Sequence, residues 1–267
     1  MGNRLLTFGC IARDMTEPKH RVQAVDIACE LLSELQERER AGITELSGAL
    51  GYAKSAVHTQ LATLEANELV VKDGTSYRLS LQFLDIAESV KDQIDKYEVI
   101  TTEVDSLAEE TGEVVQFATE EHGWLVYLYK AKGEYGVETA SSIGKHEYLH
   151  STGLGKAILS EYTDDEISRI IERRGLPKKT EKTATTEEEI QEALGQVRER
   201  GYAIDDEENI QGLRCIGASV ASNDGDVLGA LSISGPSRRM TNERIRNELE
   251  DALSKSANVI QINYKFT

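Results

Sequence analysis

The sequence predicts an α+β protein with two domains, an N-terminal winged helix-turn-helix and a C-terminal domain built on an antiparallel sheet. Apolar residues recur at helical spacing between residues 22 and 67, and two short strand-like runs around an Asp-Gly turn follow them. From Val114 the period becomes that of strands, which then mix with helices as far as residue 262. The acidity also shifts, because residues 19–80 hold seven basic and nine acidic side chains whereas residues 81–267 hold 21 and 36.

The N-terminal pattern contains three helices and a hairpin. The first helix runs from Val22 to about Arg40, the second is capped by Thr44 and closed by Gly51, and the third covers residues 53–67. Strands at 69–71 and 77–79 form the hairpin. The short, glycine-bearing connection between the second and third helices is typical of a helix-turn-helix crossing.

The exposed face of the third helix carries small and hydrogen-bonding side chains, which suit close approach to base edges in the major groove. A small three-helix domain without a DNA role is the alternative. We expect groove contacts from Lys54, Ser55, Ala56 and Thr59, and phosphate contacts from Arg38, Arg40 and Lys72. Because this part is nearly neutral, its DNA affinity should depend less steeply on salt than that of a basic domain.

Two apolar helical stripes follow between residues 81 and 112. A long helix after a winged domain is commonly a spacer and dimer contact, and packing against the second domain is the alternative. The expected division is a flexible tail at 1–19, the winged helix-turn-helix at 20–80, a helical linker at 81–112 and the sheet domain at 113–267.

The sheet domain is expected to alternate strands with helices. Strands are expected at 115–118, 124–129, 202–205, 215–222 and 227–234, and helices at 153–160, 164–174, 187–200 and 241–262.

Composition narrows the class of protein. A formal net charge of −17 excludes a generic basic nucleic-acid coat protein and favours a surface adapted to very high salt. The cysteines Cys10, Cys29 and Cys215 lack CxxC spacing, so neither a disulfide framework nor a cysteine-only zinc site is indicated. No run reaches the roughly 18 apolar residues of a membrane span, so we expect a cytoplasmic protein, with Met15 as an alternative translation start.

Two motifs are rejected on context. Residues 146–150 read H-E-x-x-H, the spacing of a zinc-protease helix, but the flanking Gly144 and Gly153 leave no room for that helix. The segment from Gly153 to Lys156 resembles half of a phosphate-binding loop, yet the required glycine and the final Ser or Thr are missing. We therefore expect no metal and no cofactor.

A small polar pocket is predicted instead. The start of a helix at Gly153 and Leu154 offers free backbone N–H groups to an anion. Asp205, Cys215, Ser232 and Ser234 lie in or beside expected strands, and the two serines, two residues apart, face the same side of a sheet.

At these residues the sequence resembles a known family. The winged segment followed by the motifs at 149–157, 201–208, 212–218 and 230–236 resembles the isocitrate lyase regulator (IclR) family. The resemblance implies a ligand-responsive transcription factor with a helical linker and a GAF-like effector domain, acting as a dimer or tetramer on genes of sugar, organic-acid or aromatic catabolism. It also implies a palindromic operator on double-stranded DNA, and a small effector, an organic or sugar acid, held by Gly153, Leu154, Asp205, Cys215, Ser232 and Ser234.

Two other functions remain open from the residues. A cysteine-dependent hydrolase would use Cys215 with His150 and Asp205, although no helix start lowers the pKa of that thiol. A metal-sensing regulator would place zinc on His146 or His150 together with Cys215 and Asp205.

Overall fold

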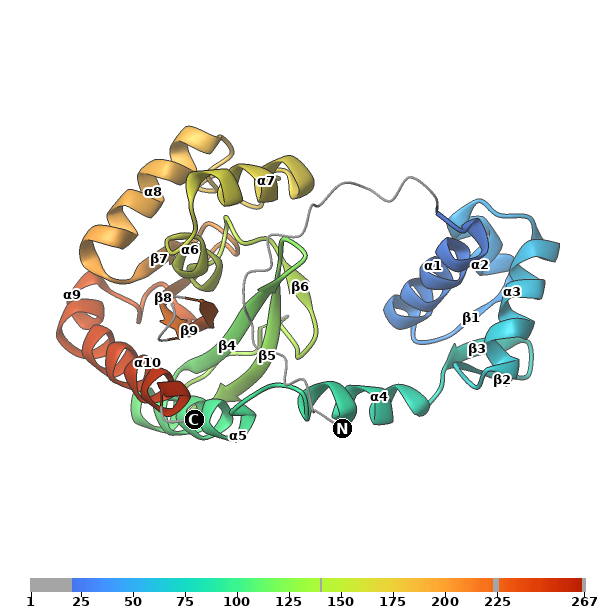
Figure 1. The fold of residues 1–267 in the computed structure, drawn as a ribbon, viewed down its shortest axis with the longest axis horizontal. Helices are drawn as coiled ribbons and strands as arrows, with labels where there is room; N and C mark the ends of the chain where they lie inside the picture. Colours follow the sequence, from blue (N-terminus) through green and yellow to red (C-terminus); the bar gives the residue numbers. More distant parts are fainter. Residues whose placement is uncertain (1–20, 140, 223–225, 266–267) are drawn as a thin grey trace. The chain divides into compact units, whose positions relative to one another are not determined.

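The computed structural model describes residues 21–139, 141–222 and 226–265, so the tail expected at 1–19 and the alternative start at Met15 lie outside the described residues. The described chain forms two compact units, residues 21–94 and 95–265, each with its own apolar core (Figure 1). No helix within the described ranges is long and apolar enough to cross a membrane.

The N-terminal unit contains the three helices and the hairpin that the sequence predicts, with one additional short strand. Its elements are α1 (Gln23–Arg38), β1 (Ala41–Gly42), α2 (Ile43–Leu50), α3 (Lys54–Ala66), β2 (Val70–Asp73) and β3 (Ser76–Leu79). The strands form an antiparallel sheet in the order β1-β3-β2. Leu31, Leu46, Leu61 and Tyr77 are among the buried residues that join the helices to this sheet.

The start of α2 differs from the prediction. Gly42 caps the helix in an extended conformation, and its backbone N–H donates to Glu45 Oε2 at 2.7 Å. Thr44 therefore lies inside the helix rather than at its cap. The predicted end is confirmed, since Gly51 adopts a left-handed φ of 74° and donates its N–H to the Ser47 carbonyl.

The segment expected as one linker contains two helices with different surroundings. No residue of α4 (Gln82–Lys91) is buried. In contrast, α5 (Tyr97–Thr111) buries Ile100, Val104 and Leu107 against the sheet of the C-terminal unit. The boundary between the compact units therefore falls at residues 94 and 95 instead of 112 and 113, because the apolar stripe of α5 packs on that sheet.

The C-terminal unit contains a six-stranded, fully antiparallel sheet in the order β6-β5-β4-β9-β8-β7. Its strands are β4 (Val114–Glu121), β5 (Trp124–Lys132), β6 (His146–Glu147), β7 (Ala203–Asp206), β8 (Leu213–Ala221) and β9 (Val227–Pro236). The α+β class and the antiparallel sheet are thus confirmed.

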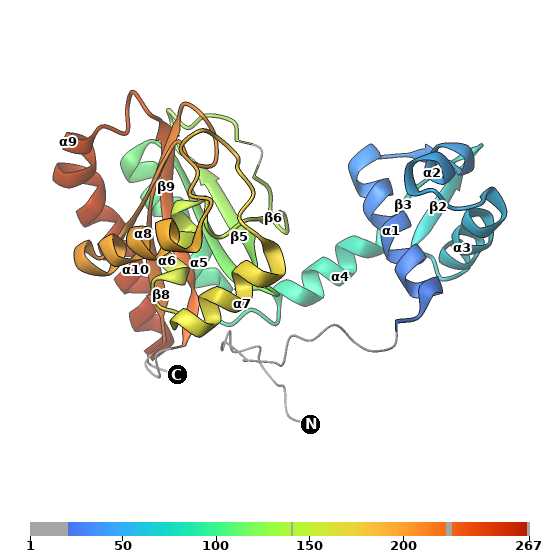
Figure 2. The same cartoon turned by 90° about the horizontal axis from the view of Figure 1, so that it is seen from above.

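Helices cover both faces of this sheet (Figures 1 and 2). One face carries α6 (Gly153–Leu159), α7 (Asp164–Arg174) and α8 (Glu187–Arg200), and the other carries α5 and α10 (Glu250–Lys265). The predicted last helix is divided into α9 (Asn242–Arg244), a π-helical turn (Ile245–Leu249) and α10. The candidate pocket lies on the face that carries α6.

Candidate functional site

Helix α3, which the sequence predicts to contact DNA, presents a polar face to solvent. Its buried residues are Val57, Leu61 and Leu64, which fix the opposite face against the core. The exposed residues expected at DNA include Lys54, Ser55 and Thr59, whereas Ala56 is half-buried. His58 and Ala62 are also exposed.

The hydroxyl of Thr59 is held in place by its own helix. Thr59 Oγ1 donates to the Ser55 carbonyl at 3.0 Å, so its oxygen lone pairs remain available as acceptors. Such a hydroxyl suits contact with a base donor in the groove.

The residues expected at phosphates are partly engaged within the protein. Arg38 pairs with Glu34 on α1, Arg40 pairs with Asp73 of the hairpin at 3.3 Å, and the Lys72 ammonium lies 5.8 Å from the Tyr77 ring centroid. Ion pairs this exposed contribute little stability, so a phosphate can replace the carboxylate partner.

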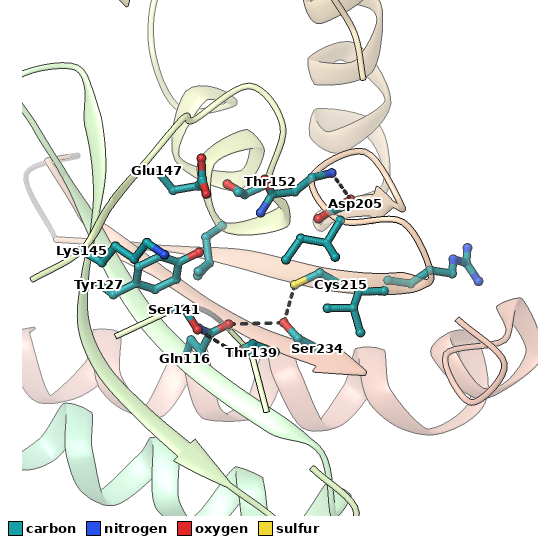
Figure 3. Close-up of a pocket in the computed structure, with 15 residues that line it drawn as sticks. Gln116, Tyr127, Thr139, Ser141, Lys145, Glu147, Thr152, Asp205, Cys215 and Ser234 are labelled. Carbon is teal, nitrogen blue, oxygen red and sulfur yellow. Dashed lines mark hydrogen bonds between the residues drawn. The ribbon is translucent and has the colours of Figure 1, made fainter. Parts of the chain in front are cut away.

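The C-terminal unit contains a pocket of about 610 Å³, including its open mouth (Figure 3). Of the six predicted effector residues, Leu154, Asp205, Cys215 and Ser234 line it. Sequence reasoning missed several further lining residues, which are Gln116, Tyr127, Thr139, Ser141, Lys145, Glu147, Thr152, Asn209, Ile210, Leu213 and Arg214.

The other two predicted residues support the pocket from outside its lining. Gly153 packs against Cys215, and a Cβ on Gly217 would lie only 2.6 Å from the Gly153 carbonyl oxygen. The first turn of α6 and strand β8 therefore meet backbone to backbone. Ser232 is fully buried on β9, between Gln116 on β4 and Gly217 on β8.

The Asp205 carboxyl group lies at the end of the pocket formed by β7. It is 7% exposed, and Oδ1 accepts the backbone N–H groups of Glu208 at 2.7 Å and Asn209 at 3.3 Å. Burial raises the pKa of Asp205 to about 7, although the nearby Lys156 ammonium opposes that rise. Lys156 is itself buried, and it pairs with Glu208 at 2.5 Å.

Cys215 carries a protonated thiol. Burial, with the nearby Asp205 charge as a second cause, raises its pKa to about 12, and the Sγ atom lies 2.7 Å from Ser234 Oγ. His150 lies elsewhere, with Nε2 3.2 Å from the Pro177 carbonyl oxygen, and it does not line the pocket. A cysteine nucleophile activated by His150 is therefore wrong for this chain, since that imidazole does not face the thiol.

The structure also gives no support to a metal centre built on the histidines. His146 lies in β6, stacked on Trp124 at a centroid distance of 5.9 Å, and the residues from 146 to 150 form no helix. Within the described ranges, no group of three or more His, Cys, Asp or Glu side chains could hold a metal ion.

Comparison with known proteins identifies the family. Residues 24–74 match the model of the IclR helix-turn-helix domain, and residues 89–262 match that of the bacterial transcriptional regulator IclR C-terminal domain. The chain belongs to the IclR family. It is therefore related to transcriptional regulators, not to enzymes.

Individual relatives agree with the IclR assignment over nearly the whole chain. A probable HTH-type transcriptional regulator ArcR from Halobacterium salinarum is 30% identical over 92% of this chain and 95% of that protein. The HTH-type transcriptional regulator KdgR from Escherichia coli is 32% identical over 87% and 89%. The crystal structure of Thermotoga maritima IclR, 24% identical, has a TM-score of 0.72 over 91% of this chain and 98% of that one, which shows the shared fold.

Replacing Ser55 and Thr59 together by alanine should weaken operator binding by about 1–3 kcal/mol per lost base contact. Ser33→Ala on α1 is the matched control. Like Thr59, exposed Ser33 donates its hydroxyl hydrogen to a backbone carbonyl four residues earlier, that of Cys29, at 3.0 Å. Gel-shift titration of both variants measures the difference. Unchanged affinity in the double variant would contradict the assignment of α3 to the groove.

Asp205→Asn should stabilise the C-terminal unit increasingly as pH rises from about 4 to 7. In that window the carboxyl group of Asp205 is ionised in the unfolded chain but still protonated in the folded one, where its pKa is about 7. Each pH unit therefore lowers the free energy of unfolding of the wild type by up to about 1.4 kcal/mol. Below the window both states are protonated, so the difference between variant and wild type no longer changes with pH. Urea unfolding at constant KCl, followed by the fluorescence of Trp124, the only tryptophan, measures the effect.

Exposed Asp251→Asn on α10 is the control for this comparison. If the free energies of unfolding of wild type and Asp205→Asn ran parallel between pH 4 and 7, burial would not raise the pKa of this carboxyl group.

Proposed function

We propose that this IclR-family protein regulates catabolic genes, and that its DNA affinity changes when a small organic or sugar acid occupies the pocket. The observation that carries the proposal is a polar pocket with a buried carboxyl group in a chain that also presents an exposed recognition helix. Such a regulator acts on double-stranded DNA in the cytoplasm.

A route from the pocket to the DNA-binding unit supports the proposal. The pocket-lining strands β4 and β5 pack on α5, which follows α4 in the chain. Tyr97 on α5 donates to the Leu128 carbonyl at 3.2 Å, and Tyr129 on β5 donates to Asp105 on α5 at 3.2 Å. An effector that binds one arrangement of these strands more tightly than another favours the position of α5 that belongs to it. Operator affinity then changes, because α5 is connected through α4 to the DNA-binding unit.

The same proposal includes a homodimer, or a tetramer built from dimers, on a palindromic operator. Leu81, Leu84, Ile86 and Val90 on and beside α4 are 43–73% exposed, which is more apolar surface than a short solvent-facing helix requires. We infer that a second copy of this chain covers α4. Two winged helix-turn-helix units joined in this way would contact the two half-sites of the operator.

Adaptation to high salt also belongs to the proposal. The net charge of −17 and the relative in Halobacterium salinarum support it. DNA and effector binding are therefore best measured at high KCl.

Gel-shift titration at high KCl tests the proposed function. The protein should prefer DNA from upstream of its own gene over a length-matched scrambled sequence, and a panel of small acids should change that affinity. Ser234→Ala should lose the response to acid and keep the DNA affinity, because Ser234 lines the pocket and lies in the other unit from α3. Ser219→Ala, a β8 hydroxyl outside the pocket, is the control.

Equal binding of both DNA sequences would contradict specific regulation at this site. Specific binding that no acid changes would contradict the effector part alone.

Replacing Leu84 and Val90 together by glutamine should shift the protein from dimer to monomer in sedimentation equilibrium, since polar side chains remove the apolar contact but preserve helix propensity. Ile262→Gln, an exposed apolar residue of α10, is the control and should leave the mass unchanged. A double variant that stays dimeric would place the interface elsewhere.

A further inference from the structure

Lys130 lies directly behind the polar wall of the pocket. It is opposite Gln116 in the β4–β5 register, so both side chains point to the pocket face of the sheet. Its ammonium donates to the Thr139 carbonyl at 3.1 Å, to Thr139 Oγ1 at 2.8 Å and to the Ser141 carbonyl at 3.1 Å. Thr139 and Ser141 both line the pocket, so only one residue separates this charge from its interior.

The charge of Lys130 has no counter-ion in the part of the chain that the structure describes. All its hydrogen-bond acceptors there are neutral oxygens, and the neighbouring Glu138 pairs with Lys132 at 2.7 Å. Partial burial lowers the pKa of Lys130 and outweighs the attraction of the nearby Glu138 charge, which pairs with Lys132 instead. A half-buried cation in this state attracts an anion more strongly than an exposed one.

The wall in front of Lys130 has two donor hydrogens without an acceptor among the described residues. Gln116 Nε2 donates to Ser141 Oγ at 2.6 Å, and the Thr139 and Ser141 hydroxyls lie 2.7 Å apart. Between them these two hydroxyls have two hydrogens, of which their mutual bond uses one. The second hydroxyl hydrogen and the second Gln116 amide hydrogen have no acceptor among the described residues. A carboxylate accepts both.

At Asp205 the pocket offers a hydrogen-bond acceptor, in contrast to the unused donors of the wall at Gln116, Thr139 and Ser141. Ser234 donates to Gln116 Oε1 at 3.4 Å, so Cys215 donates to Ser234, and these two bonds use the donor hydrogens of Cys215 and Ser234. At Asp205 only Oδ1 accepts hydrogen bonds from the described residues, which leaves Oδ2 as an acceptor once the carboxyl group has lost its proton above a pH of about 7. Figure 3 shows Asp205 across the pocket from Gln116, Thr139 and Ser141.

Two other cations line the pocket but are less suited to hold an anion inside it. Arg214 has its guanidinium engaged by the Met240 carbonyl, by Asn242 at 2.8 Å and by Asp206 at 2.6 Å. Lys145 is exposed, so water and salt screen its charge.

We propose that the pocket binds a hydroxy acid in one orientation, with its carboxylate on the donors of Gln116, Thr139 and Ser141 and a hydroxyl group donating to Asp205. Lys130 is a positioning residue that supplies the counter-charge from behind the wall. This inference rests on the proposed function, because it concerns the acid that the regulator responds to.

Calorimetric titration of the full-length protein at fixed KCl tests the orientation. The probes are glycolate, D-glycerate and D-gluconate, with D-gluconamide as the uncharged counterpart of gluconate. At least one of the three acids should bind. Lys130→Met should weaken its binding about tenfold or more, since a charge-assisted contact is lost, and Lys130→Arg should restore it. Lys132→Met is the control, because Lys132 is also on β5 but is exposed and pairs with exposed Glu138.

A second variant tests the hydroxyl end. Asp205→Asn should reduce the preference for the hydroxy acid over its unsubstituted counterpart, such as glycolate over acetate, while acetate affinity is unchanged. Circular dichroism and operator affinity without acid show that each variant is folded.

Equal acid affinity in wild type and Lys130→Met, or an equal loss in Lys132→Met, would overturn the proposal. Equal binding of gluconate and gluconamide would do the same, as would an unchanged preference in Asp205→Asn. Failure of all three acids to bind the wild type would overturn it too, and the gel shift with the wider acid panel then decides separately whether the proposed function survives.

Discussion

One buried carboxylate, Glu113, joins the segments that position the pocket. It is fully buried between α5 and β4, and it accepts hydrogen bonds from Arg239 at 2.8 and 2.6 Å and from Arg244 at 2.7 Å. Burial alone raises the pKa of Glu113, but the two guanidinium groups outweigh it and hold the pKa below its ordinary value. Because the same arginines bind the carbonyls of Thr111 and Tyr135, the end of α5, the start of β4 and the chain after β5 are fixed together.

Local sequence signals predicted most of the elements but not all of their boundaries. Apolar residues recur with a period of 3.6 in the helices of the N-terminal unit and with a period of 2 in the strands of the sheet. Both periods can be read from a short stretch of sequence. The two-residue strands β1 and β6 are too short to show a period, and they exist because β3 and β5 offer them partners. The stripe on α5 was visible, yet a stripe alone does not distinguish packing on the second domain, here on β4, β5 and α10, from a contact with a second copy.

The candidate site shows the same division. Asp205 and Cys215 face each other across β7 and β8, and Ser234 is on the next strand, so alternation along three neighbouring strands could indicate them. Gln116 lies in a predicted strand and Lys130 directly follows one, but their proposed role depends on the register between β4 and β5 and on the return of the chain at Thr139. Neither is encoded in a short window of sequence. The resemblance to the family indicated Asp205, Cys215 and Ser234, but neither Gln116 nor Lys130.

The contact between Gly153 and Gly217 limits how this pocket can diverge during evolution. Any side chain at Gly217 would strike the backbone at the start of α6, so drift in ligand preference cannot proceed by shifting that helix toward or away from β8. Change has to come from the loops that bear Thr139, Ser141 and Asn209. In the proposed effector pocket, this fixed backbone contact beside variable loops would let the ligand change while the contacts between the sheet and α5 are kept.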